Sequence, residues 1–238
     1  MRKYLIIPLI LFSFGFSQNK VNIKNLVQYG DKWFKENDDK PFTGIVFDIS
    51  KETGNKILKS RYLKGIPHGK HSEWYEGGKK KLEGNWKNGK QDGLWTYWNK
   101  YENVDSSGTY KNGNMNGLWT FLDKNGQKKE EITYEDGEIN GLFTGWYENG
   151  QKWGEQNYKN GEENGFFTQW YESGQKKRKG TYKMGKLDGL FTGWYENGQK
   201  WGEGTMKYGN KVGKWTYYNE DGSVKEVKDC NKGECDEQ

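Results

Sequence analysis

Apolar and polar side chains alternate along most of the chain. In the segment 189–195 (GLFTGWY), Leu, Thr and Trp alternate with Phe, Gly and Tyr. Alternation with a period of two is typical of a β-strand whose two faces differ, and aromatic and β-branched residues favour strands. An Asn-Gly pair follows at 197–198, and a second strand-like segment comes after it. This order of segments predicts a β-hairpin.

The hairpin pattern repeats every 24 residues over most of the chain. The segment GLFTGWYENGQKWGE occurs at 141–155 and again, unchanged, at 189–203. A fixed period of this length predicts an array of one small unit rather than a globular domain with a central core. Seven units each begin at a glycine, which we call repeat position 0: Gly69, Gly93, Gly117, Gly141, Gly165, Gly189 and Gly213.

We therefore predict an all-β fold, an elongated single-layer twisted antiparallel sheet of tandem 24-residue β-hairpins. Adjacent strands lie about 4.8 Å apart, so seven two-stranded units give a ribbon roughly 70 Å long. Alternation places repeat positions 1, 3 and 5 (Leu, Thr and Trp) on one face. Positions 2, 6 and 17 (Trp or Phe, Tyr and Tyr) are expected on the other face, so both faces carry aromatic columns.

The pairing register follows from the turn. Asn-Gly or a similar pair stands at repeat positions 8 and 9, and such a pair is typical of a two-residue turn in which both residues have positive φ. This turn places Trp146 opposite Trp153, and Trp194 opposite Trp201. Aromatic pairs of this kind would each contribute roughly 0.2–1 kcal/mol.

The same register pairs the ring at position 2 with the glycine at position 15, as with Trp95 and Gly108, so that the ring can lie over bare backbone. The second connection of each unit, such as 87–93, holds two glycines and reads as a wider loop. One edge of the ribbon is thus expected to have tight turns and the other broader loops. Glu102 stands where a turn glycine is expected, which predicts a different turn there.

The first residues have the plan of a secretory signal peptide. Arg2 and Lys3 precede an almost wholly apolar run at 4–16, and Ser17 supplies a small residue at the expected cleavage point. A membrane anchor is the alternative, but the run is shorter than the roughly 20 apolar residues that span a bilayer. The mature protein is therefore expected to be secreted, periplasmic or on the cell surface, with no transmembrane segment left after cleavage.

The segments after the signal peptide divide by their fit to the repeat. Terminal units of an array are expected to be atypical because one side faces solvent. The expected organisation is a signal peptide at 1–17, an N-terminal capping hairpin at 18–40, a degenerate first repeat at 41–68 and seven tandem repeats at 69–236.

Composition and charge limit the classes of partner that the chain can bind. Aromatic residues make up 16% of the chain, and their large rings can bury the surface that aliphatic side chains bury in an ordinary core. The formal net charge is only +5, with 38 basic and 33 acidic residues. Nucleic-acid binding needs clustered positive charge, so we expect no nucleic-acid partner.

The chain shows no catalytic arrangement. His68 and His71 are expected on loop and strand surface, and glutamates at repeat positions 7 and 14 recur beside lysines, which indicates solvated ion pairs. Cys230 and Cys235 would form a disulfide or remain two free thiols. Two thiols without a nearby histidine fall short of a metal site. We expect no catalytic residues, no metal and no cofactor.

The repeated segments resemble MORN repeats, and the bacterial variant of that repeat most closely. The motif W-Y-E-N-G-Q-K stands at 146–152 and 194–200, E-G-x-Y-K-N-G is matched as EGNWKNG at 83–89, and PFTG at 41–44 looks like an opening unit. The resemblance covers about 26–233. It implies a repeat architecture and no shared reaction. Many bacterial members are described as antitoxins of toxin–antitoxin systems, and the resemblance implies that role as one possibility.

Exposed aromatic rows on a rigid sheet can stack against sugar rings, hold an extended peptide or contact a folded partner. We therefore expect a non-enzymatic exported scaffold that binds a protein or other ligand along its aromatic sheet face. The alternatives are an antitoxin or immunity-type protein, a surface carbohydrate-binding module, and binding to a lipid headgroup. The same rings could instead only hold the sheet together. The candidate ligand-binding residues are Trp146, Tyr147, Trp170, Tyr171, Trp194 and Tyr195.

Overall fold

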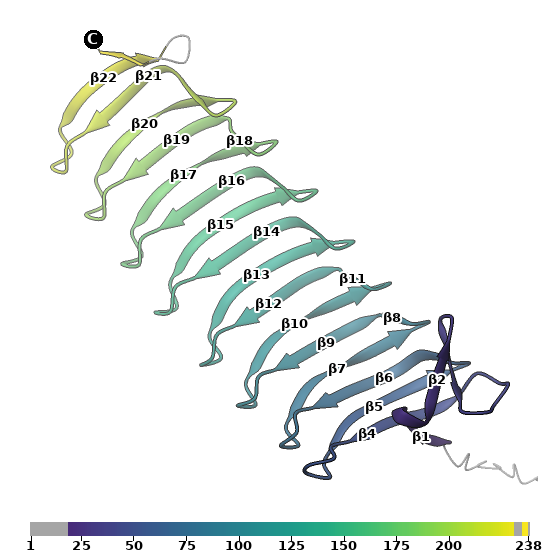
Figure 1. Cartoon of the computed structure of the whole chain (residues 1–238). Coiled ribbons are helices and arrows are strands. Elements are labelled where there is room, and N and C mark those ends of the chain that lie inside the picture. The colour runs from purple at the N-terminus through teal and green to yellow at the C-terminus, as the bar shows by residue number, and fades with distance from the viewer. Residues whose placement is uncertain (1–18, 231–234, 238) are drawn as a thin grey trace, which may run out of the picture.

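The computed structural model describes residues 19–230 and 235–237. The expected signal peptide at 1–17 lies outside the described residues. The described chain is one long ribbon of hairpins stacked side by side, with the N-terminal and C-terminal segments at opposite ends (Figure 1). No helix of the described residues has the length and apolar character needed to cross a membrane.

The elements are short strands and one turn of 3₁₀-helix, η1 (Ile23–Asn25). The strands are β1 (Lys20–Asn22), β2 (Leu26–Tyr29), β3 (Lys32–Lys35), β4 (Gly44–Ile49), β5 (Lys56–Leu63), β6 (Ile66–Trp74), β7 (Lys80–Lys87), β8 (Lys90–Gln91), β9 (Gly93–Trp98), β10 (Val104–Lys111), β11 (Asn114–Met115), β12 (Gly117–Leu122), β13 (Lys128–Glu135), β14 (Glu138–Trp146), β15 (Lys152–Lys159), β16 (Glu162–Trp170), β17 (Lys176–Lys183), β18 (Lys186–Leu187), β19 (Gly189–Trp194), β20 (Lys200–Lys207), β21 (Asn210–Tyr218), β22 (Val224–Cys230) and β23 (Asp236–Glu237).

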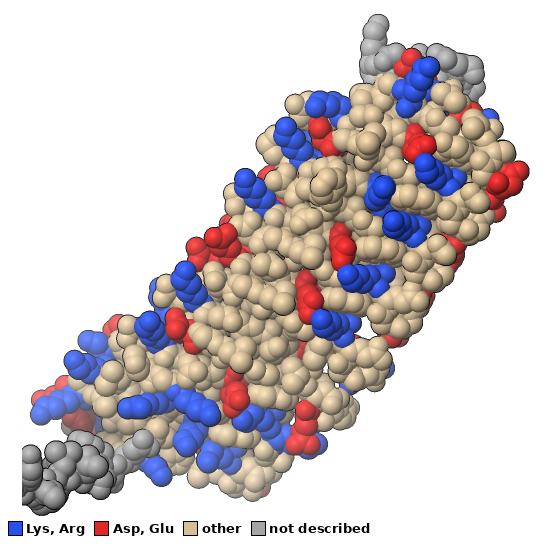
Figure 2. Space-filling view, turned by 180° about the vertical axis from the view of Figure 1, so that it is seen from behind, with Lys and Arg blue, Asp and Glu red and all other residues tan. Residues whose placement is uncertain are grey.

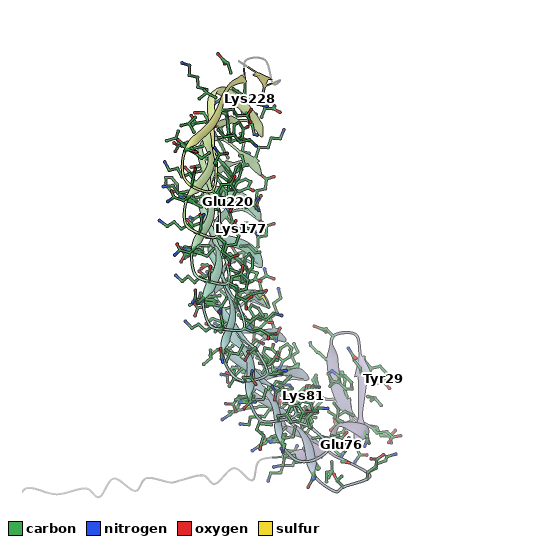
Figure 3. The ribbon with its side chains drawn as sticks, turned by 90° about the vertical axis from the view of Figure 1, so that its left-hand side faces the viewer. Tyr29, Glu76, Lys81, Lys177, Glu220 and Lys228 are labelled. Atoms are coloured by element: carbon green, nitrogen blue, oxygen red, sulfur yellow. A yellow bond between two sulfur atoms is a disulfide. The ribbon has the colours of Figure 1, made fainter. Side chains whose placement is uncertain are left out.

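Within the described residues, 21 strands form one open sheet, and β2 and β3 form a separate pair. From β4 to β23 the strands pair antiparallel with their neighbours along the chain, while β1 pairs in parallel with β4. The prediction of an all-β array of tandem hairpins is confirmed. Within residues 19–230 and 235–237, a second layer covers the sheet at the N-terminal end alone, where β2 and β3 stand off one face of the ribbon, close to the labelled Tyr29 in Figure 3.

The turn expected at repeat positions 8 and 9 is longer than predicted. The Tyr147 N–H donates to the Gln151 carbonyl at 2.8 Å, and the Gly150 N–H donates to the Tyr147 carbonyl at 3.0 Å. Gly150 has a positive φ of 84° and Asn149 does not, as in a three-residue connection that ends in a left-handed glycine. The predicted two-residue turn is therefore wrong.

The longer turn changes the register beyond it. Trp146 pairs with Lys152, and Trp194 pairs with Lys200. The predicted pairing of each tryptophan with Trp153 or Trp201 is wrong, because these two residues are the extra residues of a β-bulge.

Two-residue turns occur on the opposite edge, where broader loops were expected. Asn160 and Gly161 both have positive φ, 52° and 78°, and the flanking Lys159 and Glu162 pair directly. This geometry is a type I′ turn, whose twist matches that of the flanking strands. The second glycine of the connection, such as Gly165, marks a register shift in the following strand rather than a loop. The predicted assignment of the two edges is therefore reversed.

The turn at Glu102 is also corrected. The Asn99 N–H donates to the Asn103 carbonyl at 2.9 Å, and the Glu102 N–H donates to the Asn99 carbonyl at 3.0 Å. These are the bonds of the other three-residue turns, and Glu102 adopts the glycine conformation with φ 72°. The predicted different turn is wrong.

The two faces of the sheet differ in burial. We call the face that carries repeat positions 2, 4 and 17 the packed face, because most of its position-2 rings are almost wholly buried, with Trp119 and Trp215 each 1% exposed. We call the face that carries positions 1, 3 and 5 the open face. The tyrosine at position 6, which was also expected on the packed face, lies directly before the three-residue turn.

The pairing of Trp95 with Gly108 is confirmed. The ring that lies over Gly108 nevertheless belongs to Trp119 of the following unit. The Trp119 indole N–H also donates to the Thr109 carbonyl at 3.1 Å. The position-2 tryptophan therefore fastens its own unit to the preceding one.

The ends of the ribbon have small cores of their own. Leu26 packs with Phe42, Val46 and Tyr62, so the β2–β3 hairpin covers the packed face at the N-terminal end. Cys230 and Cys235 form a disulfide beside β23, which is one of the two alternatives left open by the sequence.

Candidate functional site

The open face carries a row of exposed apolar side chains at repeat position 1. Glycine at position 0 and the buried ring at position 2 fix the strand so that position 1 must point to the other side. Exposure ranges from 43% for Leu142 to 77% for Leu190. The row runs over five consecutive units and consists of Leu94, Leu118, Leu142, Phe166 and Leu190.

Lysine–glutamate pairs form a second row on the open face. The β-bulge lets residues three apart in sequence share one side, which brings the lysine at position 11 to the glutamate at position 14. Figure 2 shows the open face with these blue and red side chains along its length and broad tan surface between them. The pairs are Lys80–Glu83, Lys128–Glu131, Lys152–Glu155 and Lys200–Glu203.

One of these pairs has a third member. Lys200 Nζ and the Tyr218 hydroxyl each donate to a Glu203 carboxylate oxygen at 2.7 Å. Both hydrogen bonds favour the ionised carboxylate, so they lower the pKa of Glu203, and the bond to Glu203 raises the pKa of Lys200. The groups remain charged at neutral pH and are part-exposed, so their contribution to stability is small.

Three of the predicted ligand-binding residues, Trp146, Trp170 and Trp194, form a row at position 5 of the open face. Each ring is half-buried, and each pairs across the hairpin with a lysine of its own unit. Lys128 Nζ of the preceding unit lies 5.4 Å from the centre of the Trp146 ring, and Lys179 Nζ lies 5.8 Å from that of Trp194. These contacts have cation–π geometry, so the rings present only part of their surface to a ligand.

The other three predicted residues, Tyr147, Tyr171 and Tyr195, fasten neighbouring units together. The Tyr147 hydroxyl donates to the Trp170 carbonyl of the next unit at 2.9 Å. The hydroxyls of Tyr171 and Tyr195 make the equivalent bonds at 2.8 and 3.0 Å. Burial raises the pKa of Tyr171, which keeps its hydroxyl a donor. The structure therefore gives these tyrosines a structural task, and their part in ligand binding stays a prediction.

The sequence pattern did not single out the apolar row at position 1 as a candidate site. Position 1 and position 2 are both strongly apolar in every unit between Gly93 and Phe191, so the sequence did not show which of the two is buried. One feature of the sequence could have shown it. A ring at position 2 that lies over a glycine covers the sheet backbone on its own face, so position 2 is the buried position and position 1 the exposed one.

His71 is not on the surface as predicted. It occupies repeat position 2 of its unit, is 8% exposed, and lies between the rings of Trp86 and Trp95 with centroids 5.8 and 5.7 Å away. Its Nε2 is 3.3 Å from Glu73 Oε1, and this hydrogen bond lowers the pKa of Glu73. His71 thus replaces a core ring rather than forming part of a reaction centre.

No group of three or more histidine, cysteine, aspartate or glutamate side chains within the described residues has the geometry to hold a metal ion. The recurring glutamates instead face lysines along the open face. The arrangement is suited to contact along a surface rather than to chemistry at one point.

Comparison with family models finds one match, the MORN repeat variant. The model matches five separate segments: residues 67–88, 115–136, 139–160, 163–184 and 187–208. The units that begin at Gly93 and Gly213 are not matched, although their strands pair in the same way. Comparison with curated proteins found no match.

Proposed function

The chain belongs to the MORN repeat family, and from that premise we propose that it is an exported, non-enzymatic scaffold that binds a protein partner along its open face. Repeat scaffolds of this kind offer a long rigid surface in place of a single pocket. The tryptophan row at position 5 and the apolar row at position 1 lie on the same face, because both positions are odd in the strand.

The exposed apolar row is the observation that supports this proposal. Soluble proteins rarely leave a large contiguous apolar surface open unless it meets a partner. Five such side chains recur once per unit, about 10 Å apart along the ribbon, because two strands separate successive units. Full burial of one Leu or Phe side chain contributes about 1.5–3 kcal/mol, so a partner that covers several of them gains enough for specific binding.

The chemistry of the same face favours a protein over the other candidates. The lysine–glutamate pairs offer both donors and acceptors at near-zero net charge, as a polar rim around apolar anchors does. A neutral sugar would need open aromatic faces for stacking, whereas lysines lie over Trp146 and Trp194.

The test is affinity capture from the native envelope with a row variant, Leu142→Thr, Phe166→Thr and Leu190→Thr. These side chains are exposed, so the substitutions should leave the fold and its circular dichroism unchanged. We expect the row variant to lose the captured protein by at least tenfold. The triple variant Trp146→Ala, Trp170→Ala and Trp194→Ala is expected to weaken capture too, with its folding confirmed separately.

The matched control removes exposed apolar side chains that lie in turns outside the row, with Met184→Ser and Tyr208→Ser. We expect the control to capture the partner as the wild type does. Equal capture by the row variant would contradict the proposal.

Two other outcomes would identify the alternative functions. A captured protein that stops growth when produced alone would identify the antitoxin or immunity role. Binding on a glycan array that is lost in the tryptophan variant would identify a carbohydrate-binding module.

Export is part of the proposal. The apolar run at 4–16 supports it, and so does the disulfide of Cys230 and Cys235, since disulfides persist in oxidising compartments. Mass spectrometry of the protein from envelope and culture fluid should find a mature chain that begins at Gln18. An intact Met1 in the cytosolic fraction alone would contradict export.

A further inference from the structure

A hollow of about 410 Å³ lies at the N-terminal end of the open face, over β4, β5, β6 and β7. Its volume falls within the range of about 300–1,000 Å³ that is typical of small-molecule sites. Its lining is strongly basic around one aromatic ring. Lys56, Lys59, Arg61, Lys70 and Lys80 surround Trp74, and Glu83 is the one acidic residue of the lining. Figure 2 shows blue side chains gathered at this end of the face.

Three of these cations occupy repeat positions that most of the later units fill with other residues. Lys59 pairs with Ser72 as Glu155 pairs with Thr168, so Lys59 occupies repeat position 14, which is glutamate in four of the later units. Arg61 pairs with Ile45 as an asparagine pairs with Leu142 in a later unit.

Arg61 therefore occupies repeat position 16, which elsewhere carries asparagine, threonine or, in the last unit, aspartate. Lys70 occupies position 1, which holds the exposed Leu or Phe in the five units that follow. A lysine recurs singly at two of these positions, as Lys179 at position 14 and Lys214 at position 1, but only here do cations fill all three neighbouring positions. Such a local departure indicates a dedicated site, since a structural feature of the repeat would recur in every unit.

The three cations have no acidic partners of their own. Among the ion pairs of residues 19–230 and 235–237, none includes Lys59, Arg61 or Lys70, whereas Lys80 pairs with Glu83. Lys56 Nζ lies 5.6 Å from the centre of the Trp74 ring. Like charges held together repel one another, so an anion placed between them would be bound favourably.

The hydrogen-bonding groups of the hollow define the ligand further. Lysine, arginine and the Trp74 indole N–H can only donate, and the acceptors of the lining are the Ser72 hydroxyl and Glu83. A neutral sugar needs acceptors for its hydroxyl groups as well as donors. A phosphate ester offers several acceptor oxygens and negative charge, and a guanidinium such as that of Arg61 can bind it with two parallel hydrogen bonds.

We propose that this hollow is a binding site for a compact organic phosphate, held by Lys59, Arg61 and Lys70 beside Trp74. The site goes beyond the proposed binding of a protein along the open face. It shares no residue with the row variant or the tryptophan variant, so either proposal can fail without the other.

The test uses a consensus variant, Lys59→Glu, Arg61→Asn and Lys70→Leu. Each substitution installs the residue that a neighbouring unit has at that repeat position, so the variant should fold as those units do. A matched control, Lys179→Glu, Lys183→Gln and Lys186→Gln, removes the same formal charge from exposed positions far along the ribbon. Circular dichroism verifies folding of both variants.

Titration calorimetry in physiological salt measures binding of fructose 1,6-bisphosphate, with fructose as the uncharged counterpart. A second arm measures binding to phosphatidylcholine vesicles with and without one-fifth phosphatidic acid, which offers the phosphate group on a membrane. We expect the wild type and the control to bind the bisphosphate, the consensus variant to bind at least tenfold more weakly, and fructose not to bind.

Binding to the phosphatidic acid vesicles alone, again lost in the consensus variant and kept in the control, would support the phosphate site with a lipid headgroup as its source. Three results would overturn the proposal: no binding of either probe by the wild type, equal loss of binding in the two variants, or fructose binding as tight as that of the bisphosphate.

Discussion

At repeat position 15, the glycines Gly84, Gly108 and Gly204 are each covered by a tryptophan ring of the following unit, whereas Gly180 is covered by Phe167 of its own unit. A Cβ built on Gly108 would lie 2.2 Å from the ring of Trp119, and one on Gly84 would lie 2.2 Å from the ring of Trp95. The indole N–H groups of both tryptophans donate to carbonyls of the preceding unit. A single small residue therefore decides how closely two units approach.

We expect Gly108→Ala to destabilise the protein by about 1–3 kcal/mol, as overpacking of a tight core does. The Trp119 ring is 1% exposed and has no open space into which it can move. Urea unfolding, followed by tryptophan fluorescence, measures the change.

Gly154→Ala is the matched control. Gly154 is also a buried strand glycine, but a Cβ there would meet only Gln169 Cγ at 4.0 Å. The control should change stability by less than about 1 kcal/mol. If both variants unfolded at the same urea concentration, the ring contact would not limit the approach of the units.

At the scale of the element, the two kinds of turn are set by how the strands pair rather than by Asn-Gly alone. Met184 and Tyr208 adopt positive φ of 50° and 49° in the tight turns. Asn149, in a three-residue turn, instead accepts the Gln151 N–H at 2.9 Å and donates to the Glu172 carbonyl of the next unit at 2.8 Å. Its side-chain hydrogen bonds explain its presence without a positive φ.

Glu102 is the one non-glycine residue at the left-handed position of the three-residue turns within the repeats at 69–230. The left-handed conformation costs a residue with a Cβ about 1–2 kcal/mol, while its exposed ion pair with Lys79 contributes little. Glycine loses more conformational entropy on folding than glutamate does, which offsets part of this gain. We therefore expect Glu102→Gly to stabilise the protein by about 0.5–1 kcal/mol.

The reverse substitution, Gly126→Glu, tests the same position in the next unit, where φ is 82° and no atom lies within 4 Å of the Cβ site. Gly126→Glu should destabilise the protein by about as much as Glu102→Gly stabilises it, because only the backbone conformation is affected. Thermal unfolding of both variants measures the effect, and a lower midpoint for Glu102→Gly would refute the explanation.

At the scale of the whole molecule, the ribbon gains its stability from contacts between neighbouring units. A single hairpin is marginal in water, and tyrosine hydroxyls and tryptophan rings each join one unit to the next. Such an array should tolerate the loss of a whole unit, because every interface is rebuilt by the next one.

Deletion of residues 165–188 joins Asn164 to Gly189 and removes one full period. We expect a folded protein whose longest dimension in small-angle scattering is shorter by about 10 Å, the width of two strands. Deletion of 165–187 keeps Asp188 and is the matched control. One extra residue would move the apolar side chains of the next strand to the opposite face, so this control should lose β-structure or aggregate. Equal folding of the two deletions would contradict the array.

The sequence by itself determined the 24-residue period, the all-β class and the antiparallel hairpins, because strand alternation and glycine spacing are local properties. It also gave the pairing of Trp95 with Gly108. It placed Trp146, Trp170 and Trp194 in one row, since the period alone fixes that they are equivalent.

Only the tertiary structure decided which edge has the tight turns, which face is buried and which unit supplies the ring over each glycine. These depend on contacts between units, and positions 1 and 2 carry equally apolar residues until a neighbour closes over one of them. The tertiary structure also brought Lys59, Arg61 and Lys70 to one hollow. These residues lie on two strands and are up to eleven positions apart in the sequence, so only the pairing register makes them neighbours. A bulge or a longer turn can shift that register by one residue.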